Sequence, residues 1–393
     1  MKDHLISFDD TQIAFSSKSD ADLNRAFWLF KIISIHSLVQ ISPPFVNFAL
    51  WAKLPIKRLI RSTIFKHFCG GENIEECKNT IDQLGKYNIG TILDYSVEGK
   101  ESEEDFDAAL IETIATITRA KNDEHIPFSV FKPTGFARFS LLEKRNEGLE
   151  LSIVEKEEYF KFLNRIEKIC QAGFDSDVPI FIDAEESWIQ NVIDEVARSM
   201  MQKFNKEKVI IFNTLQMYRT DRLNYLRESI AHSKSFGYKS GFKIVRGAYM
   251  EKERARAKKG NYISPIQPDK NSTDRDYNTA LKICLDNLEN LAVICGTHNE
   301  QSNLNLVEWM NEKNISENHP HIWFSQLYGM SDHISFNLAS KGYNVCKYVP
   351  YGPVTGVLPY LIRRAQENTS VAGQTGRELS LIIQEKKRRK LKN

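Results

Sequence analysis

Short runs of apolar and β-branched residues recur along the chain from residue 89 onward, and a segment with helical periodicity follows each run. These runs predict eight strands, at Ile89–Asp94, Phe128–Lys132, Val178–Asp183, Val209–Thr214, Phe242–Val245, Leu291–Cys295, Ile322–Leu327 and Tyr343–Val349. The first helical segment opens at Ser102, and Asp105 three residues later predicts a capping box. Eight alternating strand–helix units within roughly 280 residues predict a (β/α)8 TIM-type barrel.

A doubly wound open sheet is the alternative architecture. Neither GxGxxG nor GxxxxGK[ST] occurs in the chain, and this absence removes the usual reason to prefer that sheet. We therefore expect a helical N-terminal region at 1–85, with breaks at Pro43-Pro44 and Gly70-Gly71, and a barrel domain at 86–370. Residues 371–393 are expected to form a C-terminal helix and a basic tail, KKRRKLKN.

Charge and cysteine usage narrow the class of protein. The 393 residues carry 53 Lys and Arg against 51 Asp and Glu, a net charge of +2, which argues against nucleic-acid binding by the whole molecule. Six scattered cysteines without a CxxC pair fit free thiols in a reducing compartment. The N-terminus lacks the pattern of a secretory signal, and no stretch reads as a membrane span. The expected location is cytoplasmic.

Polar residues stand at nearly every predicted strand end, where barrel enzymes place their chemistry. They are Lys132, Asp183, Glu185, Glu186, Gln216, Lys243, Arg246, Thr297, His298, Asn299, Gln326 and Tyr348. Any one of them could be a structural hydrogen-bonding residue. The set is poor in metal ligands, so no metal is expected, and it offers cations and amide donors instead. Those groups suit an anionic cofactor such as a flavin, whose ring becomes negative on reduction.

The segment KYVPYGPVTGVLPYLIRRAQEN, residues 347–368, is typical of a strand that breaks at Pro350-Tyr351-Gly352-Pro353 and continues as a helix. On that helix Tyr360, Arg363, Arg364 and Glu367 share one face, at i, i+3, i+4 and i+7. Two adjacent guanidiniums beside a Tyr and a Glu are typical of a site for a small carboxylate. A solvated helix face is the alternative.

These motifs together closely resemble the proline dehydrogenase family, FAD-dependent (β/α)8 enzymes. The resemblance rests on DAEE (183–186), NTLQMY (213–218), KIVRGAYMEKERARA (243–257), GTHNEQS (296–302), FSQLYGMSD (324–332) and the segment 347–368. They occur in family order over about residues 90–370, and in combination they are highly specific. The resemblance implies oxidation of L-proline to Δ1-pyrroline-5-carboxylate, with hydride passing from C5 to N5 of FAD and electrons passing on to a membrane quinone.

The resemblance also assigns roles to residues. Arg363 and Arg364 would bind the substrate carboxylate, Glu367 would fix an arginine, and Tyr348 and Tyr360 would pack on the proline ring. Lys132 and Asp183 would lie beside the substrate and tune loss of the amine proton. The positions that match FAD-binding residues are Gln216, Lys243, Val245, Arg246, Gly247, Tyr249, Thr297, His298, Asn299 and Gln326. A glycine at 247 is expected to let backbone approach the cofactor.

One position departs from the family pattern, because several bacterial members have Arg where this chain has Lys243. Bidentate contact near the flavin is therefore in doubt, although the charge is kept. Tyr348 fills the space that a hydroxyl would need, so proline is expected as substrate over 4-hydroxyproline. A separate pyrroline-5-carboxylate dehydrogenase is a candidate partner. Peripheral attachment to the inner face of the cell membrane would bring the protein close to the membrane quinone that accepts the electrons.

Two other classes of function stay open on the residues alone. A different barrel enzyme, a metal-assisted hydrolase or an aldolase, would use Lys132 or Lys243 for a Schiff base. A protein without enzymatic activity would bind nucleic acid or membrane through the tail KKRRKLKN. The near-neutral charge and the strand-end residues weigh against both.

Overall fold

The computed structural model describes residues 6–34, 56–97, 99, 101–370 and 374–390. Side chains are described in these ranges except at 56, 366–370, 374 and 375. Contacts divide the chain into two compact units. The terminal unit comprises Met1–Glu98 with Gln326–Asn393, and the central unit comprises Gly99–Ser325. The boundaries expected from the sequence, at 85 and 370, stay predictions.

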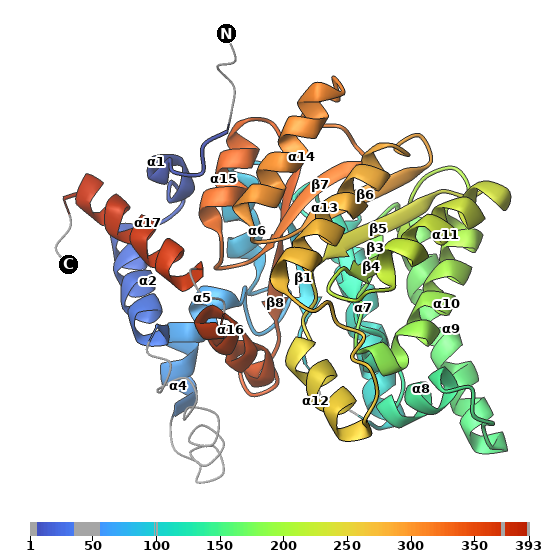
Figure 1. Cartoon of the computed structure of the whole chain (residues 1–393). Coiled ribbons are helices and arrows are strands. Elements are labelled where there is room, and N and C mark those ends of the chain that lie inside the picture. Colours follow the sequence, from blue (N-terminus) through green and yellow to red (C-terminus); the bar gives the residue numbers. More distant parts are fainter. Residues whose placement is uncertain (1–5, 35–55, 98, 100, 371–373, 391–393) are drawn as a thin grey trace. The chain divides into compact units, whose positions relative to one another are not determined.

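Eight parallel strands close into a barrel in the order β1 to β8, which confirms the (β/α)8 fold (Figure 1). The strands are β1 (Ile89–Tyr95), β2 (Phe128–Phe131), β3 (Ile180–Ile182), β4 (Ile211–Gln216), β5 (Ser240–Val245), β6 (Leu291–Gly296), β7 (Ile322–Leu327) and β8 (Val345–Tyr351). Their side chains are almost all buried, as expected for a parallel sheet covered by helices.

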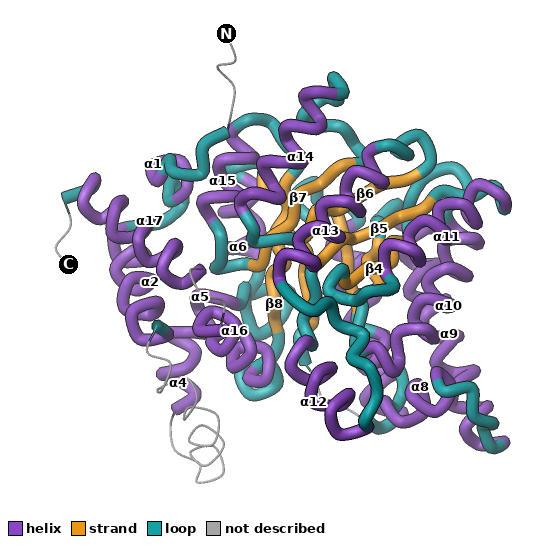
Figure 2. Tube along the Cα trace, viewed as in Figure 1, coloured by secondary structure: helices purple, strands orange, loops and turns teal. Residues whose placement is uncertain are grey.

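The central unit holds the helices that follow β1 to β6. They are α7 (Glu103–Ala120), α8 (Phe139–Asn146), α9 (Ile153–Ser176), α10 (Ser187–Phe204), α11 (Arg222–Ser235), α12 (Met250–Gly260), α13 (Lys270–Leu285) and α14 (Glu300–Glu312), with a 3-10 turn at Pro133–Gly135. Helix α10 packs against α9 and β4, and α11 packs against β4 and β5 (Figure 2). The predicted start of α7 is confirmed, because the Ser102 hydroxyl accepts a hydrogen bond from the Asp105 amide at 3.2 Å.

The terminal unit contains helices from both ends of the chain. They are α1 (Thr11–Ala14), α2 (Asp20–Ile33), α4 (Ile56–Ile60), a π-helical turn (Arg61–Phe65), α5 (Lys66–Phe68), α6 (Lys78–Gly85), α15 (Asp332–Ser340), α16 (Leu358–Ser370) and α17 (Gln374–Arg388). Helix α17 packs against α2 through Leu381 and Ile382, which join Leu23, Phe27 and Phe30 in one apolar cluster.

The strand β8 ends within the expected break at Pro350-Tyr351-Gly352-Pro353, but two residues later than the predicted strand end at Val349. Its ladder with β1 continues through the pairs Asp94–Pro350 and Tyr95–Tyr351. Proline lacks an amide donor but keeps a carbonyl. The Pro350 carbonyl accepts from the Gly70 amide at 2.9 Å, so the strand remains satisfied through its acceptors.

The six cysteines are all buried and form no disulfide, as predicted. Among the described helices, none combines the length and the apolar character that a membrane span requires. Within the same residues, no group of three or more His, Cys, Asp or Glu side chains is placed to hold a metal ion.

Candidate active site

A buried ion pair joins two of the predicted site residues in the central unit. Asp183 follows β3, Lys243 lies in β5, and their side chains are 15% and 6% exposed. The Thr214 hydroxyl on β4 donates to Asp183 Oδ1 at 3.4 Å, and the Lys243 ammonium lies 5.5 Å from the centre of the Phe181 ring. Two charges removed from water at strand ends are costly for folding, which makes the pair a candidate for chemistry. The interaction of Lys132 with Asp183 stays a prediction.

Glu185 is a second carboxyl group at the end of β3, and it is almost fully buried. The amide and hydroxyl of Thr134 donate to its two oxygens at 2.9 and 2.7 Å. Burial raises the pKa of Glu185 to about 7, whereas the bonds from Thr134 and the charge of Lys132 act in the opposite direction. Glu185 therefore titrates near neutral pH.

Gln216 links the end of β3 with the loop after β5. Its Nε2 donates to the Glu185 carbonyl at 2.7 Å, and its Oε1 accepts from the Ala248 amide at 3.0 Å. Both ends of the carboxamide are thus bound by backbone, so the orientation of the group is fixed.

Arg246, directly after β5, is held by four neighbours. Its Nε donates to Asp274 Oδ1 at 2.7 Å, and its terminal nitrogens donate to Thr297 Oγ1 at 2.5 Å and Ser302 Oγ at 2.9 Å. Its guanidinium lies 4.4 Å from the centre of the Tyr277 ring. The cation is therefore fixed next to Thr297, another predicted cofactor residue.

Gly247 has a structural reason to be glycine that differs from the expected one. Its φ is +137°, and a Cβ at this position would lie 2.6 Å from the Tyr218 ring. The close neighbour is thus a side chain of the same unit. The expected approach of a cofactor to this backbone stays a prediction.

Asn299 begins α14 by capping it. Its Oδ1 accepts from the Ser302 amide at 2.9 Å, and its own amide donates to Thr297 Oγ1 at 3.1 Å. His298 lies between Thr297 and Asn299 and is partly exposed, as are Val245 and Tyr249 near the end of β5. A helix N-terminus beside a fixed guanidinium favours an anionic group.

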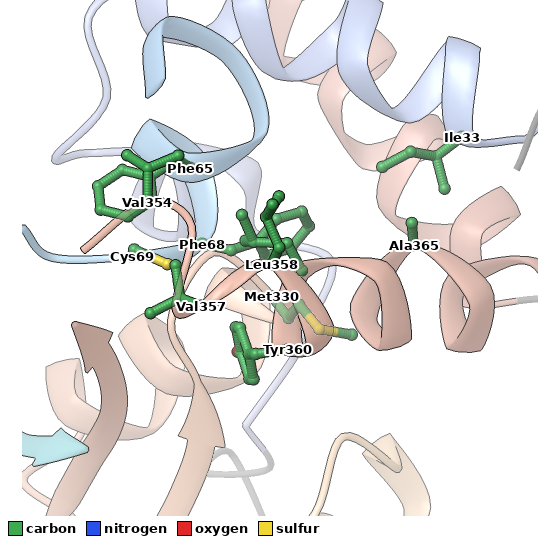
Figure 3. Packing of buried hydrophobic residues seen from close by; sticks show 11 residues of the cluster. Ile33, Phe65, Phe68, Cys69, Met330, Val354, Val357, Leu358, Tyr360 and Ala365 are labelled. Atoms are coloured by element: carbon green, nitrogen blue, oxygen red, sulfur yellow. The ribbon is translucent and has the colours of Figure 1, made fainter. Parts of the chain in front are cut away.

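The remaining predicted residues lie in the terminal unit. Tyr360 and Arg364 lie on one face of α16 as predicted, with the guanidinium 5.2 Å from the centre of the Tyr360 ring. Tyr360 belongs to an apolar cluster with Phe65, Phe68 and Met330 (Figure 3). This packing fixes the side of α16 from which Arg364 extends.

Three further predicted residues of the terminal unit are buried or partly exposed. Tyr348, in β8, is 7% exposed, and Arg363 is partly exposed. Gln326, near the end of β7, is 2% exposed, and its Oε1 accepts from Ser335 Oγ at 2.8 Å. The side chain of Glu367 lies outside the described part of the structure.

The chemistry of the central set fits a flavin dinucleotide. Lys243 and Arg246 supply positive charge, the α14 N-terminus supplies amide donors, and Gln216 supplies a fixed carboxamide. These are the groups that an anionic pyrophosphate and a ring that gains negative charge require.

Reasoning from the sequence missed the residues that hold the predicted ones. Thr134, Asp274 and Ser302 orient Glu185 and Arg246. Asp274 and Ser302 lie on helices, 28 and 56 residues after Arg246. The one signal that could have predicted these contacts is the order of strands and helices around the barrel, which brings the segments together in space.

The chain is similar to known proteins over most of its length. The family model described as proline dehydrogenase matches residues 77–377. The chain belongs to the proline dehydrogenase family. Proline dehydrogenase 1, mitochondrial, of Dictyostelium discoideum is 36% identical over 97% of this chain and 74% of its own length. Hydroxyproline dehydrogenase of Xenopus laevis is 32% identical over 98% of this chain and 90% of its own.

A solved structure of proline utilization A from Bdellovibrio bacteriovorus, inactivated by N-propargylglycine, has the same fold with a TM-score of 0.74. It is 20% identical and is matched by 94% of this chain. At 20% sequence identity, this likeness shows a shared fold and nothing more. This chain spans 40% of the length of that longer protein.

The pKa of Glu185 yields a testable pH dependence. Its value of about 7 in the folded protein lies above the ordinary 4.5, so folding favours the protonated form. This contribution to stability is complete below pH 4.5 and is lost as the pH rises to about 7. We expect the free energy of unfolding of Glu185→Gln, relative to wild type, to rise by on the order of 1–3 kcal/mol across that window and then level off.

Urea unfolding at a series of pH values measures this difference. Glu150, whose side chain is 92% exposed, supplies the control, and Glu150→Gln should follow the wild-type curve. A Glu185→Gln curve parallel to wild type from pH 4 to 8 would show that Glu185 titrates as an ordinary glutamate.

Proposed function

We propose that this protein is an FAD-dependent enzyme that oxidises L-proline to Δ1-pyrroline-5-carboxylate, with hydride transfer from proline C5 to flavin N5. The observation that carries the proposal is the match of the proline dehydrogenase family model to residues 77–377. When bound, FAD supplies the two-electron acceptor that no amino-acid side chain provides. The chain's own residues then have to hold the cofactor, bind the carboxylate and manage the amine proton.

Most of the proposed cofactor residues lie in the central unit. Arg246, fixed by Asp274, Thr297 and Ser302, and the N-terminus of α14 supply charge and donors for the pyrophosphate. Lys243 supplies positive charge for the ring as it is reduced. The remaining assignments are Gln216, Val245, Gly247, Tyr249, His298 and Asn299 in this unit and Gln326 in the terminal unit.

The terminal unit supplies the carboxylate residues, Arg363 and Arg364. A guanidinium binds a carboxylate through two parallel hydrogen bonds, and stacking on Tyr360 limits the positions that Arg364 can take. An arginine restrained in this way loses less conformational entropy when it binds a ligand. Glu367 is proposed to fix one of the two arginines.

The amine of proline is protonated in water and must lose that proton before C5 can donate hydride. Lys132 and Asp183 are the residues proposed to tune this step. A cation near the amine, such as Lys132, disfavours the ammonium, and Asp183 forms an ion pair with Lys243. Water is the candidate acceptor of the proton.

Proline is the proposed substrate, and Tyr348 is the residue proposed to exclude 4-hydroxyproline. Because the Xenopus relative is named hydroxyproline dehydrogenase, 4-hydroxyproline should be tested beside proline. The electrons are proposed to pass to a membrane quinone, with the protein in the cytoplasm and peripheral on the inner face of the cell membrane. A separate pyrroline-5-carboxylate dehydrogenase would consume the product.

The proposed activity predicts a defined product. With FAD and a water-soluble quinone, the protein should convert L-proline to a product that lacks two of its hydrogens, which mass spectrometry detects. Turnover of 4-hydroxy-L-proline should be slower, and Tyr348→Ala should narrow the difference because the side chain that meets the hydroxyl is removed. Turnover of neither substrate would contradict the function, and faster turnover of hydroxyproline by wild type would contradict the role of Tyr348.

The carboxylate assignment is tested with arginine variants. Loss of a charged hydrogen bond costs roughly 1.5–3 kcal/mol, so Arg363→Ala or Arg364→Ala should raise the apparent Kd for L-proline at least about tenfold. Arg377→Ala is the matched control, because Arg377 lies on α17 and pairs with Asp9 at 2.7 Å. Circular dichroism verifies folding. A Kd within about threefold of wild type for both site variants would exclude the carboxylate role.

A further inference from the structure

The turn between β7 and α15, residues 328–331, is held by buried polar groups from distant parts of the terminal unit. The Tyr328 amide donates to the Tyr348 carbonyl at 2.8 Å. His67 Nε2 lies 2.8 Å from the Gly329 carbonyl oxygen, and because a carbonyl only accepts, that nitrogen carries the proton. Burial lowers the pKa of His67 to about 4, which keeps the ring neutral.

The end of the same turn is bound by two charged side chains. The fully buried Lys347 donates to the Met330 carbonyl at 2.7 Å, and the Ser331 amide donates to Glu378 Oε1 at 2.5 Å. Lys347 also pairs with Asp332 at 2.7 Å, and Lys18 reaches Asp332 at 3.3 Å. Lys18, Lys347, Asp332 and Glu378 therefore form a cluster of two basic and two acidic groups, in which burial raises the pKa of Glu378.

Glu378 performs a task that the local sequence of α15 leaves undone. Ser331, the residue before this nine-residue helix, has a φ of +51°, and its side chain makes no capping hydrogen bond. The Glu378 side chain on α17, 47 residues along the chain, accepts a hydrogen bond from the Ser331 amide. A buried amide at a helix N-terminus needs an acceptor, so Glu378 stabilises the start of α15 at this position.

The first turn of α15 in turn holds Gln326. Ser335 lies one turn after Ser331 and donates to Gln326 Oε1 at 2.8 Å. Both side chains are buried, at 0% and 2% exposure. The orientation of the Gln326 carboxamide thus depends on where α15 begins, which depends on Glu378.

We propose that Glu378, on the C-terminal helix α17, is a positioning residue for the flavin contact of Gln326, acting through Ser331 and Ser335. The inference rests on the proposed function, which assigns Gln326 to the cofactor. It adds a requirement that the C-terminal helix be docked for the cofactor to bind well. Helix α17 thereby becomes part of the cofactor site although none of its residues is assigned to the ligand.

The cluster of charged and polar side chains around the turn is not itself a ligand site. Lys18, His67, Asp332 and Glu378 line a cavity of only about 10 Å³. A space of that size accommodates at most one water molecule. These side chains instead bond to one another and to the backbone of the turn.

A purely structural role for Glu378 is the alternative to be separated. Helix α17 is attached to α2 by apolar contacts of Leu381 and Ile382, which Glu378 does not make. Substitution at 378 should therefore leave α17 docked while it releases the start of α15. Glu385, buried on the same helix, bonds to Arg388 and Arg389 and supplies a matched control.

The test is the Kd for FAD, measured by flavin fluorescence on full-length apoprotein. Loss of the bond to the Ser331 amide should weaken FAD binding about tenfold in Glu378→Ala. Glu378→Gln, whose amide oxygen still accepts, should lie between that variant and wild type. Glu385→Ala should bind FAD within about twofold of wild type, because its contacts do not reach the turn.

A double-mutant cycle decides between positioning and general stability. In the Gln326→Ala background, Glu378→Ala should have no further effect on the Kd for FAD, because the residue through which it acts is gone. Hydrogen exchange at the Ser331 amide should accelerate in Glu378→Ala without FAD present. Additive effects in the cycle, or an unchanged Kd in Glu378→Ala, would overturn the proposal. Wild-type protein that binds no FAD would instead overturn the proposed function.

Discussion

A closed ladder of parallel strands is the constraint on which the rest of this structure depends. Parallel pairing brings the carboxyl ends of β1 to β8 to the same end of the barrel, so residues far apart in the sequence share one rim. The ladder also explains the extent of burial, since strands covered on both faces leave only their ends for polar groups. Asp183, Gln216 and Arg246 all stand at such ends. Their position at a strand end is enough to make them candidates for the site, whatever side chains they contact.

Hydrogen bonds from helices and loops then fix those polar groups. Gln216 is oriented by two backbone groups, Arg246 by Asp274 and two hydroxyls, and Gln326 by Ser335. The site is therefore organised within each unit by residues that need not touch a ligand. Such preorganisation lowers the cost of binding, because the groups are ordered when the protein folds. Glu378 extends the same principle to the C-terminal helix.

The sequence could predict the barrel because short apolar runs alternate with segments of helical periodicity. The predicted end of β8 came two residues early, because Pro350 and Tyr351 still pair with β1 although proline lacks an amide donor. Strand-end residues such as Asp183 could be predicted from position. Their partners could not: the bonds of Arg246 to Asp274 and of Glu378 to Ser331 join segments 28 and 47 residues apart, and local patterns carry no record of such pairs.

Hydride transfer from proline to a bound flavin is the property proposed for this family member. It can be tested by the absorbance spectrum of purified protein reconstituted with FAD, recorded before and after anaerobic addition of L-proline. The flavin band should bleach on addition of proline and return when a quinone is admitted. A flavin band that proline leaves unchanged, in protein shown to be folded, would contradict the proposed hydride transfer.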